Sequence, residues 1–137
     1  MKFKNILLSA CAALVMISQP GFSKEIKIGL LNETTGGNAT IGTAAANGAK
    51  LAIKEINANG GLLGKQIKAV VADNKSEPSE AANAMTKLLT QDRVVAVTGT
   101  FSSSNAIAAA SVAEANKSPY LVAGATNPKV TVDEKTK

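Results

Sequence analysis

The sequence has no histidine, no tryptophan and a single cysteine, and its only aromatic residues are three phenylalanines and one tyrosine. Without histidine, Ser-His-Asp and Cys-His catalytic sites and histidine-based zinc sites are excluded. The loops considered below also lack paired carboxylates, so no catalytic constellation is present. The sequence therefore predicts a protein that is not an enzyme and that holds neither a metal nor a cofactor.

The sequence also lacks a large excess of either positive or negative charge. Without Lys2 and Lys4, which belong to the segment discussed next, 13 basic residues face 10 acidic ones, for a net charge of +3. The lysines are scattered and almost no aromatic residues lie between them. This pattern is typical of a solvated surface and indicates no nucleic-acid partner.

The first 23 residues have the pattern of an export signal. Lys2 and Lys4 form a basic start, Ile6–Ile17 is almost wholly apolar, and Gly21-Phe22-Ser23 supplies small residues for cleavage. The apolar run is too short to span a membrane. Leu8-Ser9-Ala10-Cys11 also resembles a lipoprotein cleavage box, but only about five apolar residues precede Cys11. Cleavage and soluble export to the periplasm are favoured over a lipid anchor, and the mature chain then holds no cysteine and no disulfide.

From residue 24 onward, predicted strands and helices alternate. The strands are 26–31, 67–72, 94–97 and 120–123, and the helices begin near Ile41, at Pro78 and after the serines at 102–104. This βαβαβαβ order predicts an α/β fold, a Rossmann-like doubly wound parallel sheet with helices on both faces. If the strand order is 2-1-3-4, the order reverses between the first and third strands.

The spacing of apolar residues predicts which helix faces are buried. The second helix has the stripe Ala81, Met85, Leu88 and Leu89, and the third has Ala106, Ala109, Ala110 and Ala113, small enough to lie close to a sheet. In the first helix, Ile41, Ala45, Gly48, Ala49, Ala52, Ile53 and Ile56 are predicted to face the sheet, with Lys50, Lys54 and Asn57 opposite.

The chain ends at Lys137, about fourteen residues past a predicted strand and without a closing helix. Four parallel strands with an uncovered edge make a poor domain by themselves. We interpret residues 24–137 as the front part of a longer protein, in preference to a small complete domain.

The stretch from Val94 to Ala106 is the strongest candidate for a site. A short apolar strand is followed by Gly99, then by Ser102, Ser103 and Ser104, and then by an Ala-rich helix. This order directs hydroxyls and unpaired N–H groups of the first helical turn toward one place, which suits an anion. The alternative is that the serines are ordinary N-caps.

Ligands of such sheets bind at the carboxyl ends of strands, where the strand order reverses. Three loops, 32–40, 99–104 and 124–127, are expected to meet there. All are rich in Gly, Ser, Thr and Asn and poor in charge. They suit a neutral or zwitterionic small molecule and lack the Lys and Arg of a phosphate site.

Two nucleotide-binding interpretations fail on spacing. Gly60-Gly61-Leu62-Leu63-Gly64-Lys65 is one residue short of a phosphate-binding loop and precedes a strand. Asp73 ends the second predicted strand, where a ribose-binding acid would lie, but no Gly-x-Gly-x-x-Gly follows the first strand. Asp73 is expected to cap a loop or to lie at the surface.

From Glu25 to Thr131 the chain resembles the N-terminal lobe of the periplasmic branched-chain amino-acid binding proteins, the Leu/Ile/Val-binding type. The resemblance is carried by Ile26-Lys27-Ile28-Gly29 with Thr35-Gly36, Gly48-Ala49, Ile56-Asn57-Ala58-Asn59-Gly60-Gly61-Leu62-Leu63-Gly64, Asp73, Pro78, Gly99 with Ser103, and Ala123-Gly124-Ala125-Thr126-Asn127-Pro128. It implies a type I periplasmic binding protein fold of two lobes and a hinge, of which this chain has the first.

The resemblance also implies ligand contacts. Ser103 would offer its hydroxyl and N–H to the ligand's α-carboxylate, as the serine at the third helix does in the family. Gly124 would accept the ammonium at its carbonyl, and Thr126 would contact both groups. Phe101 and Ile41 match positions that flank the ligand, although better-known members have tyrosine in place of Ile41. With Ser102, which shares the helix start, these are the candidate ligand-binding residues.

The function that the resemblance implies is that of an extracytoplasmic solute-binding protein. Such a protein is a monomer that binds an amino acid or amide and delivers it to the membrane permease of an ABC importer. The alternative is the extracytoplasmic sensor domain of a receptor. The family's acidic partner for the ammonium lies on the second lobe, so the sequence does not select among amino acids.

Overall fold

A computed structural model describes residues 25–132. Within them, four strands alternate with three α-helices, and a 3-10 turn follows the last strand. The elements are β1 (Ile26–Asn32), α1 (Ala39–Ala58), β2 (Ile67–Asp73), α2 (Pro78–Thr90), β3 (Ala96–Gly99), α3 (Ser103–Ala115), β4 (Tyr120–Val122) and η1 (Pro128–Val130). The predicted export signal and Cys11 lie outside the described residues.

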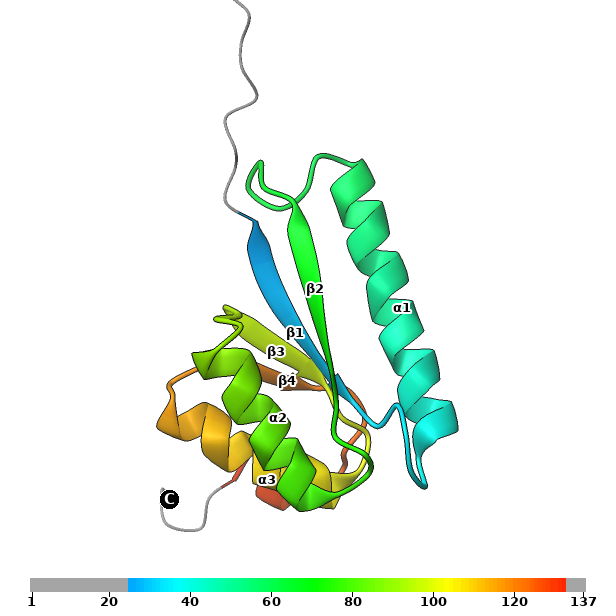
Figure 1. Cartoon of the computed structure of the whole chain (residues 1–137), viewed down its shortest axis with the longest axis vertical. Helices are drawn as coiled ribbons and strands as arrows, with labels where there is room; N and C mark the ends of the chain where they lie inside the picture. The colour runs from blue at the N-terminus through cyan, green and yellow to red at the C-terminus, as the bar shows by residue number, and fades with distance from the viewer. Residues whose placement is uncertain (1–24, 133–137) are drawn as a thin grey trace, which may run out of the picture.

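The sheet is parallel, with the strand order β2-β1-β3-β4. In Figure 1, α1 covers one face of the sheet while α2 and α3 lie together on the other. The predicted α/β class and the helices on both faces are therefore confirmed, and the strand order is the one on which the expected position of the site depended. Because all strands run the same way, the loops that follow them gather at one edge of the sheet.

The core lies between the sheet and the α2–α3 pair. Its buried members are Leu31, Ala81, Met85, Leu88, Val94, Val97, Ala109 and Ala113. The predicted stripe of α2 is thus confirmed, with Leu89 packed at its margin. The alanines of α3 contribute to the same cluster, so their small size brings α3 close to α2 as well as to the sheet.

The predicted buried face of α1 is partly wrong. The buried residues of α1 itself are Gly42 and Ala46, whereas Ile41 and Ile56 are 46% and 41% exposed. The contact face is rotated by about one residue from the predicted one. Of the predicted positions, Ala45, Ala49 and Ile53 are half-buried, while Gly48 and Ala52 are exposed.

Two contacts explain this rotation of α1. Gly42 lies directly against the backbone carbonyl of Glu33, where a Cβ would overlap that carbonyl. This close approach is possible only on the face of α1 that carries the glycine. At the other end of the helix, the Asn57 carboxamide, predicted to face away, accepts from the Ile67 N–H at 2.7 Å and donates to the Ile67 carbonyl at 2.8 Å. A backbone contact and a hydrogen-bonded pair thus outweigh burial of the larger apolar side chains.

The third strand begins later than predicted. It comprises Ala96–Gly99 rather than 94–97, because the Val94 N–H donates to the Leu88 carbonyl and belongs to the preceding turn. Gly99, expected to break the strand, pairs with Leu31 and Val122 as its last residue.

Of the two edge strands of the sheet, β2 and β4, the shorter one is β4. It has only three residues, and its central residue, Leu121, is 73% exposed. Among the described helices, none is both long and apolar enough to cross a membrane.

We predict that Asn57→Ala lowers the free energy of unfolding by about 1–3 kcal/mol, because the Ile67 N–H and carbonyl both lose their partner. Urea denaturation measures the change. Asn47→Ala, at an exposed position of the same helix, is the matched control. Equal stability of the two variants would contradict a fastening role for Asn57.

Candidate ligand-binding site

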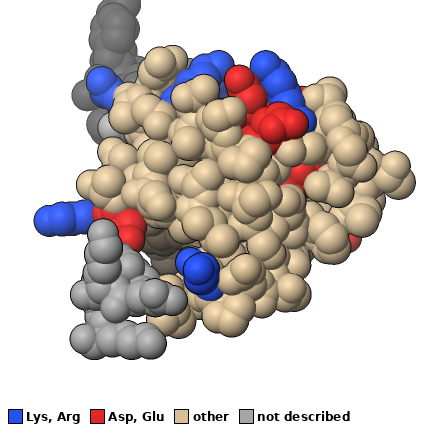
Figure 2. All heavy atoms as spheres, turned by 90° about the horizontal axis from the view of Figure 1, so that it is seen from below, with Lys and Arg blue, Asp and Glu red and all other residues tan. Residues whose placement is uncertain are grey.

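Three loops follow β1, β3 and β4 at the same edge of the sheet, at residues 33–38, 100–102 and 123–127. Glu33 is the only charged residue in these loops, and it is fully buried. Figure 2 views the molecule from this end and shows a broad surface without charged side chains. Within the described residues, no cluster of three or more His, Cys, Asp or Glu could hold a metal ion.

The turn from β3 into α3 is tight because two successive residues have positive φ. Gly99 has φ +127° and Thr100 has φ +63°, an uncommon conformation for a β-branched residue. A Cβ at Gly99 would overlap the Leu31 carbonyl. The same carbonyl accepts from the Thr100 N–H at 2.7 Å and from its hydroxyl at 3.1 Å. The end of β1 therefore fastens the turn that carries the start of α3.

The chain itself supplies an anion at the start of α3. The Glu33 carboxylate accepts hydrogen bonds from the N–H groups of Phe101 and Ser102, each at 3.1 Å, and from the carboxamides of Asn74 and Asn105 at 3.3 and 3.4 Å. The N–H groups of Phe101 and Ser102, which immediately precede α3, are therefore occupied by this carboxylate and are not free for a ligand.

The three serines of this turn have different surroundings. Ser102 stands at the N-cap position but makes no capping hydrogen bond, and its hydroxyl pairs with that of Ser104 at 3.0 Å. The alternative that the serines are ordinary caps is thus not what the structure shows. The Ser103 hydroxyl accepts from the Asn127 N–H at 3.4 Å, which places Ser103 beside the loop after β4. Among the hydrogen bonds of residues 25–132, none uses the N–H of Ser103 or Ser104.

The loop after β4 contacts the turn before α3 through a glycine. A Cβ on Gly124 would overlap the Phe101 ring, so this ring lies directly against the Gly124 backbone. The Gly124 N–H donates to the Thr100 carbonyl at 3.3 Å.

The candidate residues Phe101, Ser102, Ser103, Gly124 and Thr126 therefore lie in two adjoining loops. Ile41 stands apart from them, in the first turn of α1. Phe101 and Ile41 are 44% and 46% exposed. Their contact with a ligand stays a prediction for all six.

Asp73 joins the loops after β1 and β2. Its carboxylate accepts from the Thr34 and Thr35 N–H groups at 2.9 and 3.2 Å, from the Thr35 hydroxyl at 2.6 Å, and from the Lys75 N–H at 2.9 Å. Burial alone would raise the pKa of Asp73, but these hydrogen bonds lower it to about 2. The residue caps a loop, as the sequence predicted.

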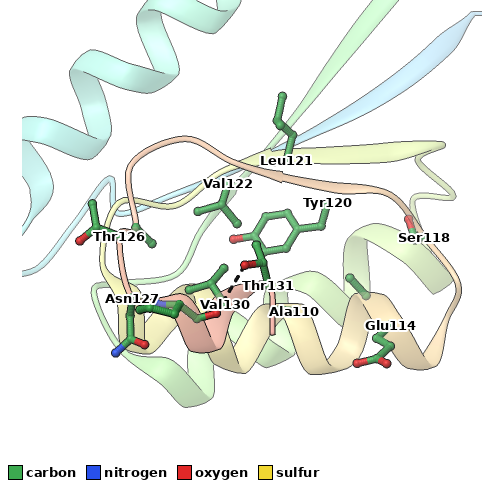
Figure 3. A pocket seen from close by; sticks show the side chains of 13 residues that line it. Ala110, Glu114, Ser118, Tyr120, Leu121, Val122, Thr126, Asn127, Val130 and Thr131 are labelled. Carbon is green, nitrogen blue, oxygen red and sulfur yellow. Dashed lines mark hydrogen bonds between the residues drawn. The ribbon is translucent and has the colours of Figure 1, made fainter. Parts of the chain in front are cut away.

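A groove of about 560 Å³ lies beside these loops, between α3, β4 and η1. Figure 3 shows the Tyr120 ring within it, with the hydroxyl directed toward the end where Thr126 and Asn127 lie. Burial raises the pKa of Tyr120 to about 12, opposed by the nearby Thr100 hydroxyl and assisted by the charge of Glu33. The Tyr120 oxygen is buried and has no partner of normal hydrogen-bond geometry within the described residues. Of the candidate residues, only Thr126 lines this groove.

The sequence reasoning missed the buried polar residues beneath the loops, namely Glu33, Asn74, Thr100 and Asn105. One signal was available for Glu33: a single acidic residue directly follows an apolar strand in a loop that otherwise has no charge. Burial of such a residue requires donors, and the next strand end supplies them.

Comparison with known proteins identifies the family. The sequence profile described as "Periplasmic binding protein" matches residues 25–135. The chain belongs to this periplasmic binding protein family. An "Amino acid binding protein" from Pseudomonas aeruginosa is 37% identical to this chain over 128 residues, covering 93% of the chain and 34% of that protein. This periplasmic binding protein chain thus spans about a third of the length of the curated relatives that it matches.

Solved structures agree with the family and the fold. The branched-chain amino-acid transporter substrate-binding protein LivJ from Streptococcus pneumoniae, in complex with isoleucine, is 46% identical with a TM-score of 0.77, over 79% of this chain and 31% of LivJ. A solute-binding protein of an ABC transporter from Rhodopseudomonas palustris, in complex with 3,4-dihydroxybenzoic acid, is 30% identical with a TM-score of 0.71, over 78% and 29%. The resemblance to the Leu/Ile/Val-binding type is confirmed.

The lowered pKa of Asp73 predicts a pH dependence. Because the pKa in the folded state lies below the ordinary value of 3.8, the stability that this carboxylate contributes is present above that value and is lost as the pH falls toward about 2. Asp73→Asn should be less stable near neutral pH and should lose less further stability on acidification. Urea denaturation at a series of pH values tests this, with Asp92→Asn at the opposite end of the sheet as control. Identical pH profiles for Asp73→Asn and the unmodified protein would contradict the assignment.

Proposed function

We propose that the intact protein binds a branched-chain or other small amino acid, or an amide, and delivers it to the membrane permease of an ABC importer. Residues 24–137 form the N-terminal lobe in this proposal, and the ligand lies between it and a second lobe. Residues 1–23 direct export to the periplasm and are then removed. The protein acts as a monomer and leaves its ligand chemically unchanged.

The observation that carries the proposal is the open donor set at the start of α3. The N–H groups of Ser103 and Ser104 have no acceptor within residues 25–132, and the Ser103 hydroxyl lies beside the loop after β4. A carboxylate that loses its water on binding needs such fixed donors. The positive end of the α3 dipole adds to its stabilisation.

The remaining contacts follow the family resemblance. The Gly124 carbonyl accepts from the ligand ammonium, and Thr126 uses its N–H and hydroxyl on the carboxylate and ammonium. Phe101 and Ile41, both about half exposed, cover the ligand from two elements. Ser102 supports the turn between Phe101 and Ser103. The second lobe supplies the acidic partner of the ammonium.

Two of the relatives support a carboxylate as the part of the ligand that this lobe recognises. LivJ was solved with isoleucine and the Rhodopseudomonas protein with 3,4-dihydroxybenzoic acid. These two ligands share a carboxylate and differ in almost everything else. A lobe whose open donors are N–H groups and a hydroxyl suits that shared group, so selection among side chains belongs to Ile41, Phe101 and the second lobe.

A thermal-shift panel on the intact protein tests the proposed ligand class. The panel contains amino acids, their amides and small aliphatic and aromatic carboxylates. A ligand present at about 100 times its dissociation constant adds about 2.7 kcal/mol to the free energy of unfolding. We expect at least one aliphatic amino acid to raise the melting temperature. A flat response to all amino acids and amides would refute the proposal.

Ser103→Ala should weaken binding of the ligand found in that panel by about 1–3 kcal/mol, because a hydrogen bond to a charged group is lost. Isothermal titration calorimetry measures the change. Ser111→Ala is the matched control, because Ser111 is an exposed serine of the same helix whose hydroxyl donates to the Ile107 carbonyl. Equal affinities of the two variants would remove Ser103 from the site.

A further inference from the structure

A carboxylate lies directly beneath the proposed ligand site and has no exposed surface. Glu33 is 0% exposed, and its oxygens accept from two main-chain N–H groups and two carboxamides. None of these four donors is a cation, so the charge is stabilised by dipoles alone. A fully buried group of this kind is not positioned to touch a ligand, so its role concerns the residues that it holds.

We propose that Glu33 is a positioning residue, which holds Phe101 and Ser102 so that Ser103 meets the ligand; this inference rests on the proposed function. The N–H groups of these two residues, which lie immediately before Ser103, donate to the Glu33 carboxylate. Glu33 thereby also determines which N–H groups remain open. Those of Phe101 and Ser102 are occupied from below, and those of Ser103 and Ser104 are left for a ligand anion.

The strained turn shows why such a hold is needed. Gly99 and Thr100 both have positive φ, and Thr100 is β-branched. A conformation of this kind persists only where the surroundings determine it. Leu31 fixes Thr100 through its carbonyl, and Glu33, two residues further along, fixes the next two N–H groups. Without Glu33, only the first half of the turn stays fastened.

Two carboxamides connect this hold to the rest of the lobe. Asn74, from the loop after β2, donates to Glu33 and accepts from the Ser76 N–H at 3.0 Å. Asn105, in the first turn of α3, donates to both Glu33 and Asn74, each at 3.4 Å. The ends of β1 and β2 and the start of α3 thus share one buried network, and Glu33 is its single charged member.

The test compares Glu33→Gln with the unmodified intact protein by amide hydrogen exchange, which needs no ligand. The glutamine retains the shape of Glu33, but an amide donor replaces one of the two accepting oxygens. Phe101 contacts both Glu33 oxygens and Ser102 contacts one of them, so we expect exchange at Phe101, at Ser102 or at both to accelerate by about tenfold or more, while exchange at Leu30 in β1 stays unchanged. Glu55→Gln, the same substitution at an exposed position of α1, should change neither.

A third variant separates positioning from general loss of stability. Met85→Ala leaves a cavity in the core beneath α2, so it lowers the melting temperature without touching the turn. For a ligand found in the thermal-shift panel, Glu33→Gln should lower the affinity by about tenfold. Met85→Ala should leave the affinity unchanged, even if it lowers the melting temperature as much as Glu33→Gln does. Asn105→Ala should accelerate exchange at the same two amides to a smaller degree, and it decides the question if Glu33→Gln does not fold.

The inference is overturned if exchange at Phe101 and Ser102 is unchanged in Glu33→Gln, or if it rises evenly along the chain as in Met85→Ala. It is also overturned if affinity falls equally in these two variants. If no compound of the panel binds the unmodified protein, the proposed function fails, while the exchange data still decide whether Glu33 holds the turn.

Discussion

The structure depends on how the end of β1 holds the beginning of α3. Two acceptors at the end of β1 bind the turn between β3 and α3. The Leu31 carbonyl accepts from the N–H and the hydroxyl of Thr100, and the Glu33 carboxylate accepts from the next two N–H groups. A side chain on Gly99 would prevent this approach. The position of every candidate residue in the β3–α3 turn follows from this crossing.

This arrangement changes the usual view of a helix start as an anion site. The positive end of a helix attracts an anion wherever one is available, and here the protein places its own carboxylate at the two N–H groups immediately before α3. A second anion is then limited to the donors further into the first turn. In our proposal, an internal charge therefore defines the geometry of the ligand site without contacting the ligand.

Much of the fold could be predicted from the sequence, because strand and helix periodicities are local and the βαβ rules are general. The α/β class and the buried stripe of α2 could be predicted from these rules alone, whereas the strand order could only be assumed. The rotation of α1 could not be predicted, since it depends on one backbone contact at Gly42 and one paired carboxamide at Asn57. For the site, hydroxyl-rich loops after strands were visible in the sequence. The burial of Glu33 was not, because its donors lie about 70 residues away along the chain.

The short outer strand β4 has a practical consequence for work on residues 25–132 alone. The outer side of β4 has no neighbouring strand within residues 25–132, and its central residue Leu121 is largely exposed, so unpaired backbone groups and an apolar side chain are both accessible to another chain. Produced in isolation, this part of the chain is therefore expected to self-associate at the concentrations needed for crystallisation or spectroscopy. A polar substitution at Leu121 would be the first choice for keeping such a preparation monomeric.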